Sequence, residues 1–171
     1  MRFVIFLASL SVLSCPSLTP GSLDDMQVWK WQFQGAQENG RKIEGSGTLT
    51  TSRHPDPDGW YTVESIQGSR NGIAIKRLYP AGKNIPGDIN PSTRIPYTGD
   101  NRIRLHVEGQ EAQLDQHGIQ FELANGTYSN IFFASFLKPP AYLDFHSEPP
   151  YPMGAVEPNS ESRIQFSAHP E

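Results

Sequence analysis

Large apolar residues alternate with polar ones along the first extended segment of the chain. In VWKWQFQGA every second position is aromatic, with lysine and glutamine between: the aromatic residues are Trp29, Trp31 and Phe33. Successive side chains of a strand point to opposite faces, so this pattern predicts a strand with one buried face. The next segment, KIEGSGTLTT, alternates in the same way, with Ile43, Gly45, Gly47 and Leu49 on its apolar side.

The connection between these two segments decides their register. A two-residue turn at Asn39-Gly40 would set the aromatic residues opposite polar ones, which mixes the two faces. A three-residue loop over 38–40, with Gly40 in a left-handed conformation, keeps the apolar faces together. This loop pairs Phe33 with Gly45, Trp31 with Gly47 and Trp29 with Leu49. We therefore expect a hairpin in which large rings lie over glycines.

Similar turn and strand patterns occur along the rest of the chain. Asn71-Gly72 and Asn125-Gly126 each separate extended segments, which predicts two further hairpins. The alternation in 102–107 predicts a one-sided strand, and the proline-flanked YLDFH segment (142–146) predicts a strand at a sheet edge. Residues 79–101 are longer than most connections in compact domains, and we expect them to form a functional loop.

These segments together predict an all-β fold. No stretch of ten residues has a helical period, and fifteen Gly and fifteen Pro along 171 residues provide turns between short strands. The length fits one domain. We expect a single antiparallel meander of eight to ten strands, closed as a barrel or folded as a sandwich.

Charge excludes one class of partner. The formal net charge is −4, and the isoelectric point is near 5.7. Nucleic-acid binders neutralise phosphates with clustered positive charge, so we expect no nucleic-acid partner.

The N-terminus predicts export. Residues 1–14, MRFVIFLASLSVLS, carry one basic residue, Arg2, ahead of an apolar run, as a signal peptide does. The run is shorter than the roughly 20 apolar residues that span a bilayer. We divide the chain into a signal peptide (1–14), a polar tether (15–26) and an all-β domain (27–171).

Cys15 is the only cysteine, and it lies at the end of the apolar run. The preceding Val12-Leu13-Ser14 resembles the bacterial lipobox, in which the cysteine becomes the lipid-bearing N-terminus. This resemblance implies lipidation at Cys15 and a membrane partner through the attached lipid. The alternative is an incidental cysteine that is removed with the signal, leaving a soluble periplasmic or extracellular protein.

The domain itself resembles a family of exported bacterial β-domains. The segments that carry the resemblance are GSGTLTTS, WYTVESIQGSRNGIAI and LDQHGIQFEL, between residues 28 and 135. Many members carry a PEP-CTERM sorting tail, which the last residues here, NSESRIQFSAHPE, do not resemble. The resemblance implies fold and export, but no catalytic or ligand residues.

Motifs for catalysis and metal binding are weak. HPDPDGW places Asp56 and Asp58 before Gly59, as in the opening of a calcium loop, but it is also an ordinary turn. The five histidines are too dispersed for a zinc pair, and we expect His106 and His146 to be solvated. The GSG sequence lies within a strand pattern, so it is no nucleophile elbow. We therefore assign no catalytic residue, no metal and no cofactor.

The middle of the chain is basic. Seven cations between 70 and 104 are accompanied by only two acids, Asp88 and Asp100: the cations are Arg70, Lys76, Arg77, Lys83, Arg94, Arg102 and Arg104. This excess fits either an exposed strand face or a docking surface for an anionic ligand. Within the long loop, rings and cations could hold a sugar or an anion, and the candidate ligand-binding residues are Tyr79, Lys83, Arg94 and Tyr97.

We therefore expect an exported, lipid-anchored envelope protein that acts as a binding or structural module, with envelope polysaccharide or another anionic ligand as a possible partner. The alternative is a small secreted or periplasmic enzyme of the hydrolase type. A histidine that meets a carboxylate in a pocket would favour the enzyme. A pocket lined by the tyrosines and cations of the loop would favour the binding module.

Overall fold

The computed structural model describes residues 26–36, 40–90, 93–107, 109, 112–151 and 161–171. The expected signal peptide, Cys15, most of the tether and Asn39 lie outside these ranges. Within them every regular element is a strand, so no helix there is long and apolar enough to cross a membrane. The strands are β1 (Met26–Ala36), β2 (Lys42–Ser52), β3 (Trp60–Arg70), β4 (Ile73–Leu78), β5 (Arg102–Arg104), β6 (Ile119–Leu123), β7 (Tyr128–Ala134), β8 (Ala141–Ser147) and β9 (Glu161–Pro170).

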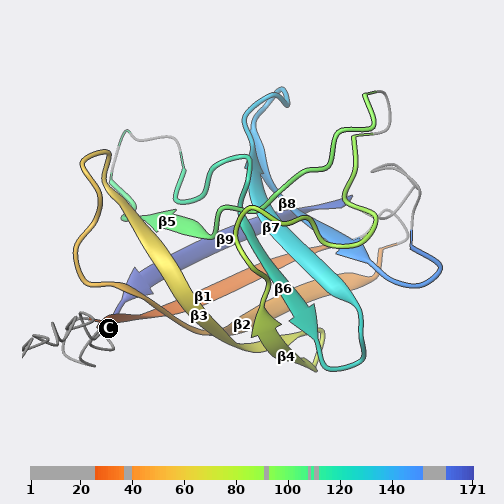
Figure 1. Ribbon diagram of the computed structural model, residues 1–171, viewed down its shortest axis with the longest axis horizontal. Helices are drawn as coiled ribbons and strands as arrows, with labels where there is room; N and C mark the ends of the chain where they lie inside the picture. The colour runs from red at the N-terminus through yellow and green to blue at the C-terminus, as the bar shows by residue number, and fades with distance from the viewer. Residues whose placement is uncertain (1–25, 37–39, 91–92, 108, 110–111, 152–160) are drawn as a thin grey trace, which may run out of the picture.

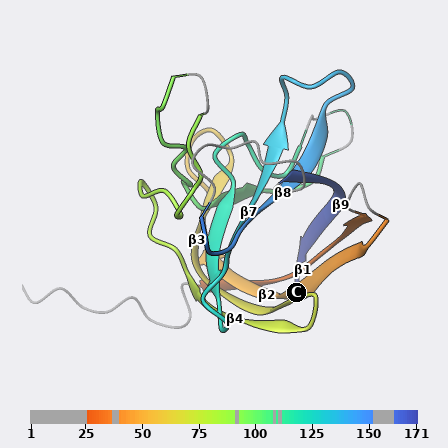
Figure 2. The ribbon, with the colours of Figure 1, turned by 90° about the vertical axis from the view of Figure 1, so that its right-hand side faces the viewer.

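Eight of these strands form a closed antiparallel barrel. Around the barrel the order is β1, β2, β3, β4, β6, β7, β8 and β9, and β9 pairs with β1 to close it (Figures 1 and 2). Each strand of the barrel therefore lies next to its neighbours in the sequence, which confirms the predicted meander and selects the barrel over the sandwich. The short β5 lies outside the ring and pairs with the beginning of β3.

The first hairpin has the predicted register. Phe33 lies opposite Gly45, Trp31 opposite Gly47 and Trp29 opposite Leu49, and Gly40 has a φ of 78°. All three aromatic side chains are buried in the main core, together with apolar residues from the other barrel strands. The indole N–H of Trp29 donates to Thr51 Oγ1 at 3.0 Å, so its polar atom is also satisfied.

The two glycines of β2 are required for different reasons. A Cβ on Gly45 would lie 2.4 Å from the Phe33 ring, as expected from the sequence. A Cβ on Gly47 would instead lie 2.0 Å from the backbone oxygen of Gln67. Gly47 pairs with Gly68 of β3, so the missing side chains let two backbones approach closely. The expectation that Gly47 makes room for the Trp31 ring is thus corrected.

Two strand predictions are wrong in detail. The alternation over 102–107 forms a strand only at 102–104, and Leu105 and Val107 are exposed, because the chain leaves β3 after three paired residues. The 142–146 segment does not lie at an edge. It forms β8 in the closed sheet between β7 and β9, and the neighbouring prolines fall outside the strand, where no ladder hydrogen bond is needed.

The long loop covers the outer face of the sheet at β7 and β8 (Figure 1). Ile85 from the loop is fully buried in a second apolar cluster with Phe132, Ala134, Leu143 and Phe145. This cover explains why residues on both faces of β6, β7 and β8 are buried. The loop is therefore a packed layer of the fold.

The basic middle of the chain is largely paired with acids from elsewhere. Lys76 and Arg77 both contact the carboxylate of Glu122, each at 2.6 Å. Arg70 points into the barrel and donates two hydrogen bonds to Asp144 of β8, at 2.9 and 2.7 Å. The cations that are clustered in the sequence therefore do not form one continuous cationic face in the folded protein.

Candidate functional site

A small cleft lies where the beginnings of β3 and β6 meet the end of β7. It has a volume of about 260 Å³, and its lining combines an indole, a guanidinium, a carboxylate, an imidazole and a hydroxyl with apolar side chains. The lining residues are Trp60, Arg104, Ala112, Leu114, Asp115, Gln116, His117, Phe133 and Ser135. We refer to it as the Trp60 cleft.

Asn101 fixes the end of the long loop behind this cleft. Its φ of 53° lies in the left-handed region, which asparagine tolerates better than most residues, and its side chain is buried. Its side-chain Nδ2 donates to the carbonyl of Tyr79 at 2.7 Å, and its side-chain Oδ1 accepts from the backbone N–H of Gln120 at 3.0 Å. Its carbonyl accepts from the N–H of Val63 at 2.8 Å. The neighbouring Asp100 is therefore held in a fixed position.

Asp100 and Asp115 form a hydrogen-bonded carboxyl pair. Burial, the negative charge of Asp115 and the hydrogen bond between the two groups raise the pKa of Asp100 to about 6. Asp115 Oδ1 also accepts from the backbone N–H groups of His117 at 2.8 Å and Gly118 at 3.1 Å. The raised pKa lets Asp100 keep its proton up to a higher pH than an ordinary aspartate does. Oδ1 of Asp100 is buried and has no hydrogen-bond partner.

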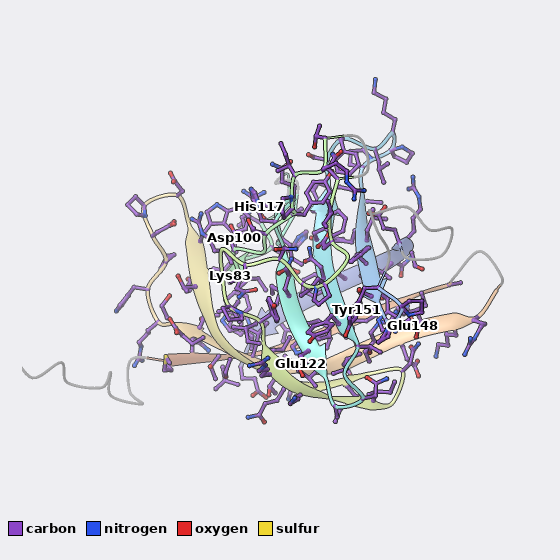
Figure 3. The ribbon with its side chains drawn as sticks, turned by 45° about the vertical axis from the view of Figure 1, so that its right-hand side comes forward. Lys83, Asp100, His117, Glu122, Glu148 and Tyr151 are labelled. Atoms are coloured by element: carbon purple, nitrogen blue, oxygen red, sulfur yellow. The ribbon has the colours of Figure 1, made fainter. Side chains whose placement is uncertain are left out.

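His117 lies beside this pair (Figure 3). Its Nδ1 lies 3.1 Å from the carbonyl oxygen of Thr98. A carbonyl only accepts, so Nδ1 carries the hydrogen and Nε2 of the neutral ring is left as an acceptor. The exposed ring and the Asp115 carboxylate line the same cleft.

Trp60 forms the opposite side of the cleft beneath two arginines. The guanidinium carbons of Arg104 and Arg102 lie 4.8 and 5.4 Å from the ring centroid, within cation–π range.

Arg102 also forms an ion pair with Asp56. Asp56 Oδ1 in turn accepts from the backbone N–H groups of Asp58 and Trp60. The HPDPDGW segment is therefore a turn that positions Trp60, and the calcium-loop interpretation is not supported. Among the described residues no three His, Cys, Asp or Glu side chains gather into a metal site.

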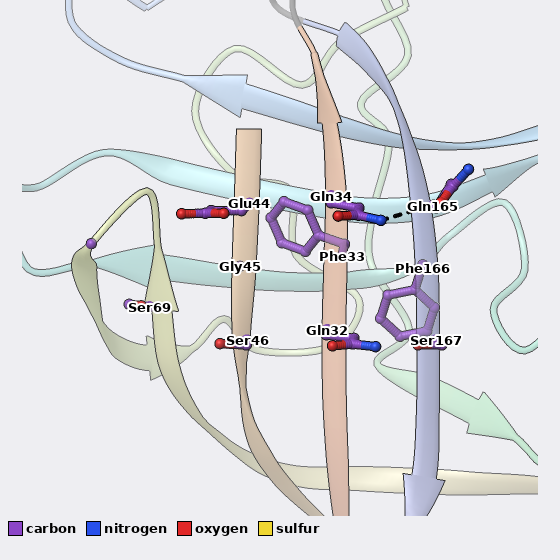
Figure 4. Close-up of a pocket in the computed structure, with 11 residues that line it drawn as sticks. Gln32, Phe33, Gln34, Glu44, Gly45, Ser46, Ser69, Gln165, Phe166 and Ser167 are labelled. Atoms are coloured by element: carbon purple, nitrogen blue, oxygen red, sulfur yellow. Dashed lines mark hydrogen bonds between the residues drawn. The ribbon is translucent and has the colours of Figure 1, made fainter. Parts of the chain in front are cut away.

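A second, wider groove of about 540 Å³ lies on the outer face of β9, β1, β2 and β3 (Figure 4). Its polar side chains follow two cross-strand rows: one contains Ser167, Gln32, Ser46 and Ser69, and the other contains Gln165, Gln34 and Glu44. Such a row is what the polar side of an alternating strand presents to water. The groove lacks the ionisable pair and the exposed ring of the Trp60 cleft, which is the stronger candidate.

None of the four predicted ligand residues lines the Trp60 cleft or the wider groove. Tyr79 packs its ring against Tyr128 at 5.7 Å, and Tyr97 accepts a hydrogen bond from Asn90 Nδ2 at 2.6 Å. Arg94 is exposed, in the outer part of the loop. Lys83 is exposed, and its carbonyl accepts from Gly99, next to Asp100 (Figure 3). Their role in ligand binding stays a prediction.

The histidines differ from one another more than the sequence indicates. His106 is exposed as predicted, but His146 is mostly buried, which corrects the expectation that it is solvated. It faces into the barrel near Arg70, and burial followed by the charge of Arg70 lowers the pKa of its ring. The alternation that places it on the polar side of β8 is correct, but this polar side belongs to the barrel interior.

Sequence reasoning missed Asp100 and Asp115. With eighteen acids in the chain, no spacing marks these two as partners. The available signals are local: Asp100 ends the long loop before a left-handed asparagine, and Asp115 opens the turn DQHG ahead of β6. Their pairing depends on Asn101, whose bonds cross from the loop to β6.

The fold and the cleft define a class of protein: an eight-stranded up-and-down barrel with a covered face and a small polar cleft. Compared with known proteins, the chain matches no protein-family model, no curated protein and no solved structure.

Proposed function

We propose that this protein is an exported, lipid-anchored envelope module that binds a sugar residue of an envelope polysaccharide in the Trp60 cleft. The observation that carries the proposal is the composition of the cleft. Trp60, with the guanidinium of Arg104 over its ring, provides a planar surface and a donor, and Asp115 and His117 provide acceptors beside it. The expected signal peptide and the lipobox-like sequence before Cys15 support export and anchoring.

Binding is tested with soluble envelope polysaccharide fragments and saturation-transfer NMR on the full chain. His117→Ala removes the Nε2 acceptor, and we expect it to weaken binding by about tenfold, the effect of one lost hydrogen bond of about 1.4 kcal/mol. His169→Ala is the matched control, because His169 is exposed on β9 and does not line the cleft. Equal affinities for His117→Ala and the unmodified protein would remove this cleft from the proposal.

Anchoring is tested separately by labelling cells with radioactive palmitate. We expect label in the unmodified protein and none in Cys15→Ala, which should then leave the membrane fraction. Unchanged labelling and fractionation of Cys15→Ala would reject the lipid anchor while leaving the binding proposal intact.

A hydrolase is the second candidate, and one observation favours it. The pKa of Asp100 is raised beside Asp115, and the His117 ring presents an acceptor nearby, so one carboxyl could protonate a leaving oxygen while another basic group accepts a proton from water. This enzyme would release reducing ends from the same fragments, and Asp115→Asn would abolish the release. Binding without any turnover would favour the module over the enzyme.

A further inference from the structure

The barrel is only narrowly joined between β3 and β4. Among the described residues these two strands pair only next to their connecting turn, where 69–70 lie opposite 73–74. Beyond that point the strands diverge, and a groove of about 690 Å³ lies between residues 64–68 of β3 and residues 75–78 of β4. We refer to it as the β3–β4 groove. Its lining shares no residue with that of the Trp60 cleft.

The turn between the two strands determines which backbone groups of β3 face this groove. Asn71 and Gly72 both have a positive φ, 48° and 77°, as in a two-residue type I′ turn. The residues that flank such a turn exchange both backbone hydrogen bonds, and every second residue of a strand presents its N–H and C=O to the same side. Arg70 therefore directs these groups toward β4, and so do Gly68 and Ile66.

The β4 wall of the groove follows the same alternation. The carbonyl of Ala74 accepts from the N–H of Ala124 on the β6 side at 2.8 Å, so the N–H and C=O of Ile75 face β3. In the described pairing of the two strands, neither Ile75 nor the facing residues Ile66 and Gly68 have a partner across the groove. A strand edge with unpaired backbone groups is a template for another extended chain. Both walls are therefore edges that one added strand would complete.

The floor of the groove is apolar. Ile66, Ile75 and Leu78 line it, and all three pack against the main core of the barrel. Alternate side chains of an extended peptide point to opposite faces, so every second residue of an added strand would contact this floor. The 64–68 segment has a length of about 17 Å at about 3.3 Å per residue, which suits a short peptide.

The rim on the β4 side is basic. The side chains of Lys76 and Arg77 are each 58% exposed, whereas that of Glu122, which both of them contact, is only 6% exposed. The charge that this wall presents to solvent is therefore positive, and it complements an acidic side chain. On the β3 side the exposed ionisable residue of the lining is Glu64.

We propose that the β3–β4 groove binds an extended peptide segment of a partner protein, which adds a strand between β3 and β4. The peptide backbone pairs with both walls, its alternate apolar side chains contact the floor, and an acidic side chain lies beside Lys76. In strand addition of this kind the main-chain hydrogen bonds provide affinity and the alternate side chains provide specificity.

NMR titration of the full chain with a synthetic capped peptide of sequence TVEVTVE tests the proposal. We expect the amide signals of Ile66, Gly68 and Ile75 to shift and their hydrogen exchange to slow when the peptide binds. The control is the same peptide with N-methyl groups on its valines, which keeps every side chain but lacks those main-chain donors, and we expect it not to bind. Absence of shifts at about 1 mM TVEVTVE would overturn the proposal, because strand addition would then be weaker than about 4 kcal/mol. Equal binding of the N-methylated peptide would overturn it as well.

Hydrogen exchange in the protein alone tests the vacant edge. The amides of Ile66 and Gly68 should exchange about a hundredfold faster than that of Gln67, which alternation directs toward its partner strand β2. Equally slow exchange of all three would show that the groove edge is already hydrogen-bonded and would overturn the proposal.

A charge reversal tests the position of the acidic side chain. Lys76→Glu should weaken binding of TVEVTVE by about tenfold, because it places like charges side by side. Lys42→Glu is the matched control: Lys42 also pairs with an acid, Glu44, but it lies on β2 and does not line the groove. Equal affinities for Lys76→Glu and Lys42→Glu would contradict the proposed placement beside Lys76.

Discussion

Asp100 combines a fixed backbone with an unusual ionisation. The left-handed Asn101 holds the segment, and Asp115 lies within hydrogen-bonding reach, so the carboxyl group is kept partly out of water beside another negative charge. Its raised pKa of about 6 is a direct result of this placement. Above this pKa the Asp100 carboxylate is repelled by the charge of Asp115, and the folded state carries that repulsion.

The pH dependence of Asp100→Asn follows from the sign of this shift. Because the pKa is raised from 3.8 to about 6, the folded protein binds more protons than the unfolded one between these values. The stabilisation by Asp100 is complete below pH 3.8 and is lost as the pH rises through 6. Relative to the unmodified protein, Asp100→Asn should therefore gain about 1 kcal/mol between pH 4 and 7, since its amide donates to Asp115 without charge.

Urea unfolding at a series of pH values measures this difference. Asp58→Asn serves as the control, because Asp58 is exposed in a turn and undergoes the same chemical substitution. A difference between Asp100→Asn and the unmodified protein that does not change with pH would contradict the raised pKa of Asp100.

At the scale of the strands, close packing decides which substitutions β2 tolerates. Gly45 makes room for the Phe33 ring, whereas Gly47 makes room for the backbone of β3. A side chain can change its rotamer or be shortened, but the backbone of a paired strand cannot move without loss of its hydrogen bonds.

A second substitution that shortens the facing aromatic side chain should therefore rescue the Gly45 variant but not the Gly47 variant. We expect Gly45→Ala and Gly47→Ala each to cost about 1 to 3 kcal/mol of unfolding free energy. Adding Phe33→Leu to Gly45→Ala should recover part of the loss, because the added methyl meets the ring. Adding Trp31→Phe to Gly47→Ala should recover nothing. Lys30→Val, on the exposed face of β1, provides the control: it removes only an exposed ion pair with Glu171 and should cost little. Rescue of Gly47→Ala by the change at Trp31 would contradict the observed backbone contact.

At the scale of the whole molecule, a buried ion pair links strands across the barrel. Arg70 belongs to β3 and Asp144 to β8, and their side chains are only 4% and 0% exposed. Ser129 of β7 donates to the other oxygen of Asp144. The pair joins parts of the sheet that are not neighbours, so it depends on the closed barrel.

Removing one residue of the Arg70–Asp144 pair should lower the free energy of unfolding much more than replacing both residues. Asp144→Ala leaves the Arg70 guanidinium buried without its carboxylate, and we expect a loss of about 3 to 5 kcal/mol. The double variant Arg70→Met with Asp144→Leu removes both charges, and we expect it to recover most of that loss. Chemical denaturation of the three proteins measures the difference. A double variant as unstable as Asp144→Ala would contradict the interpretation that an unpaired buried charge causes the loss.

The sequence by itself determined most of the strands, their turns and the register of the first hairpin. These features depend on neighbours along the chain: the alternation of Trp29, Trp31 and Phe33 defines a face, and the loop ending at Gly40 fixes which residues pair. The same local patterns indicated the antiparallel meander. They could not decide between barrel and sandwich, because pairing of β1 with β9 joins residues from opposite ends of the chain.

Only the tertiary structure decided which polar residues are buried together. Alternation correctly placed His146 on the polar side of β8, but closure of the barrel turned that side inward, where Asp144 is buried as well. The pairing of Asp100 with Asp115 depends on the bonds of Asn101 to Tyr79 and Gln120, and Asp88 meets Gln120 and Asn130 only where the loop covers β6 and β7. The alternation along a strand determines on which face of the sheet each side chain lies. What each side chain contacts depends on segments that are distant in the sequence, and the candidate cleft is built from such contacts.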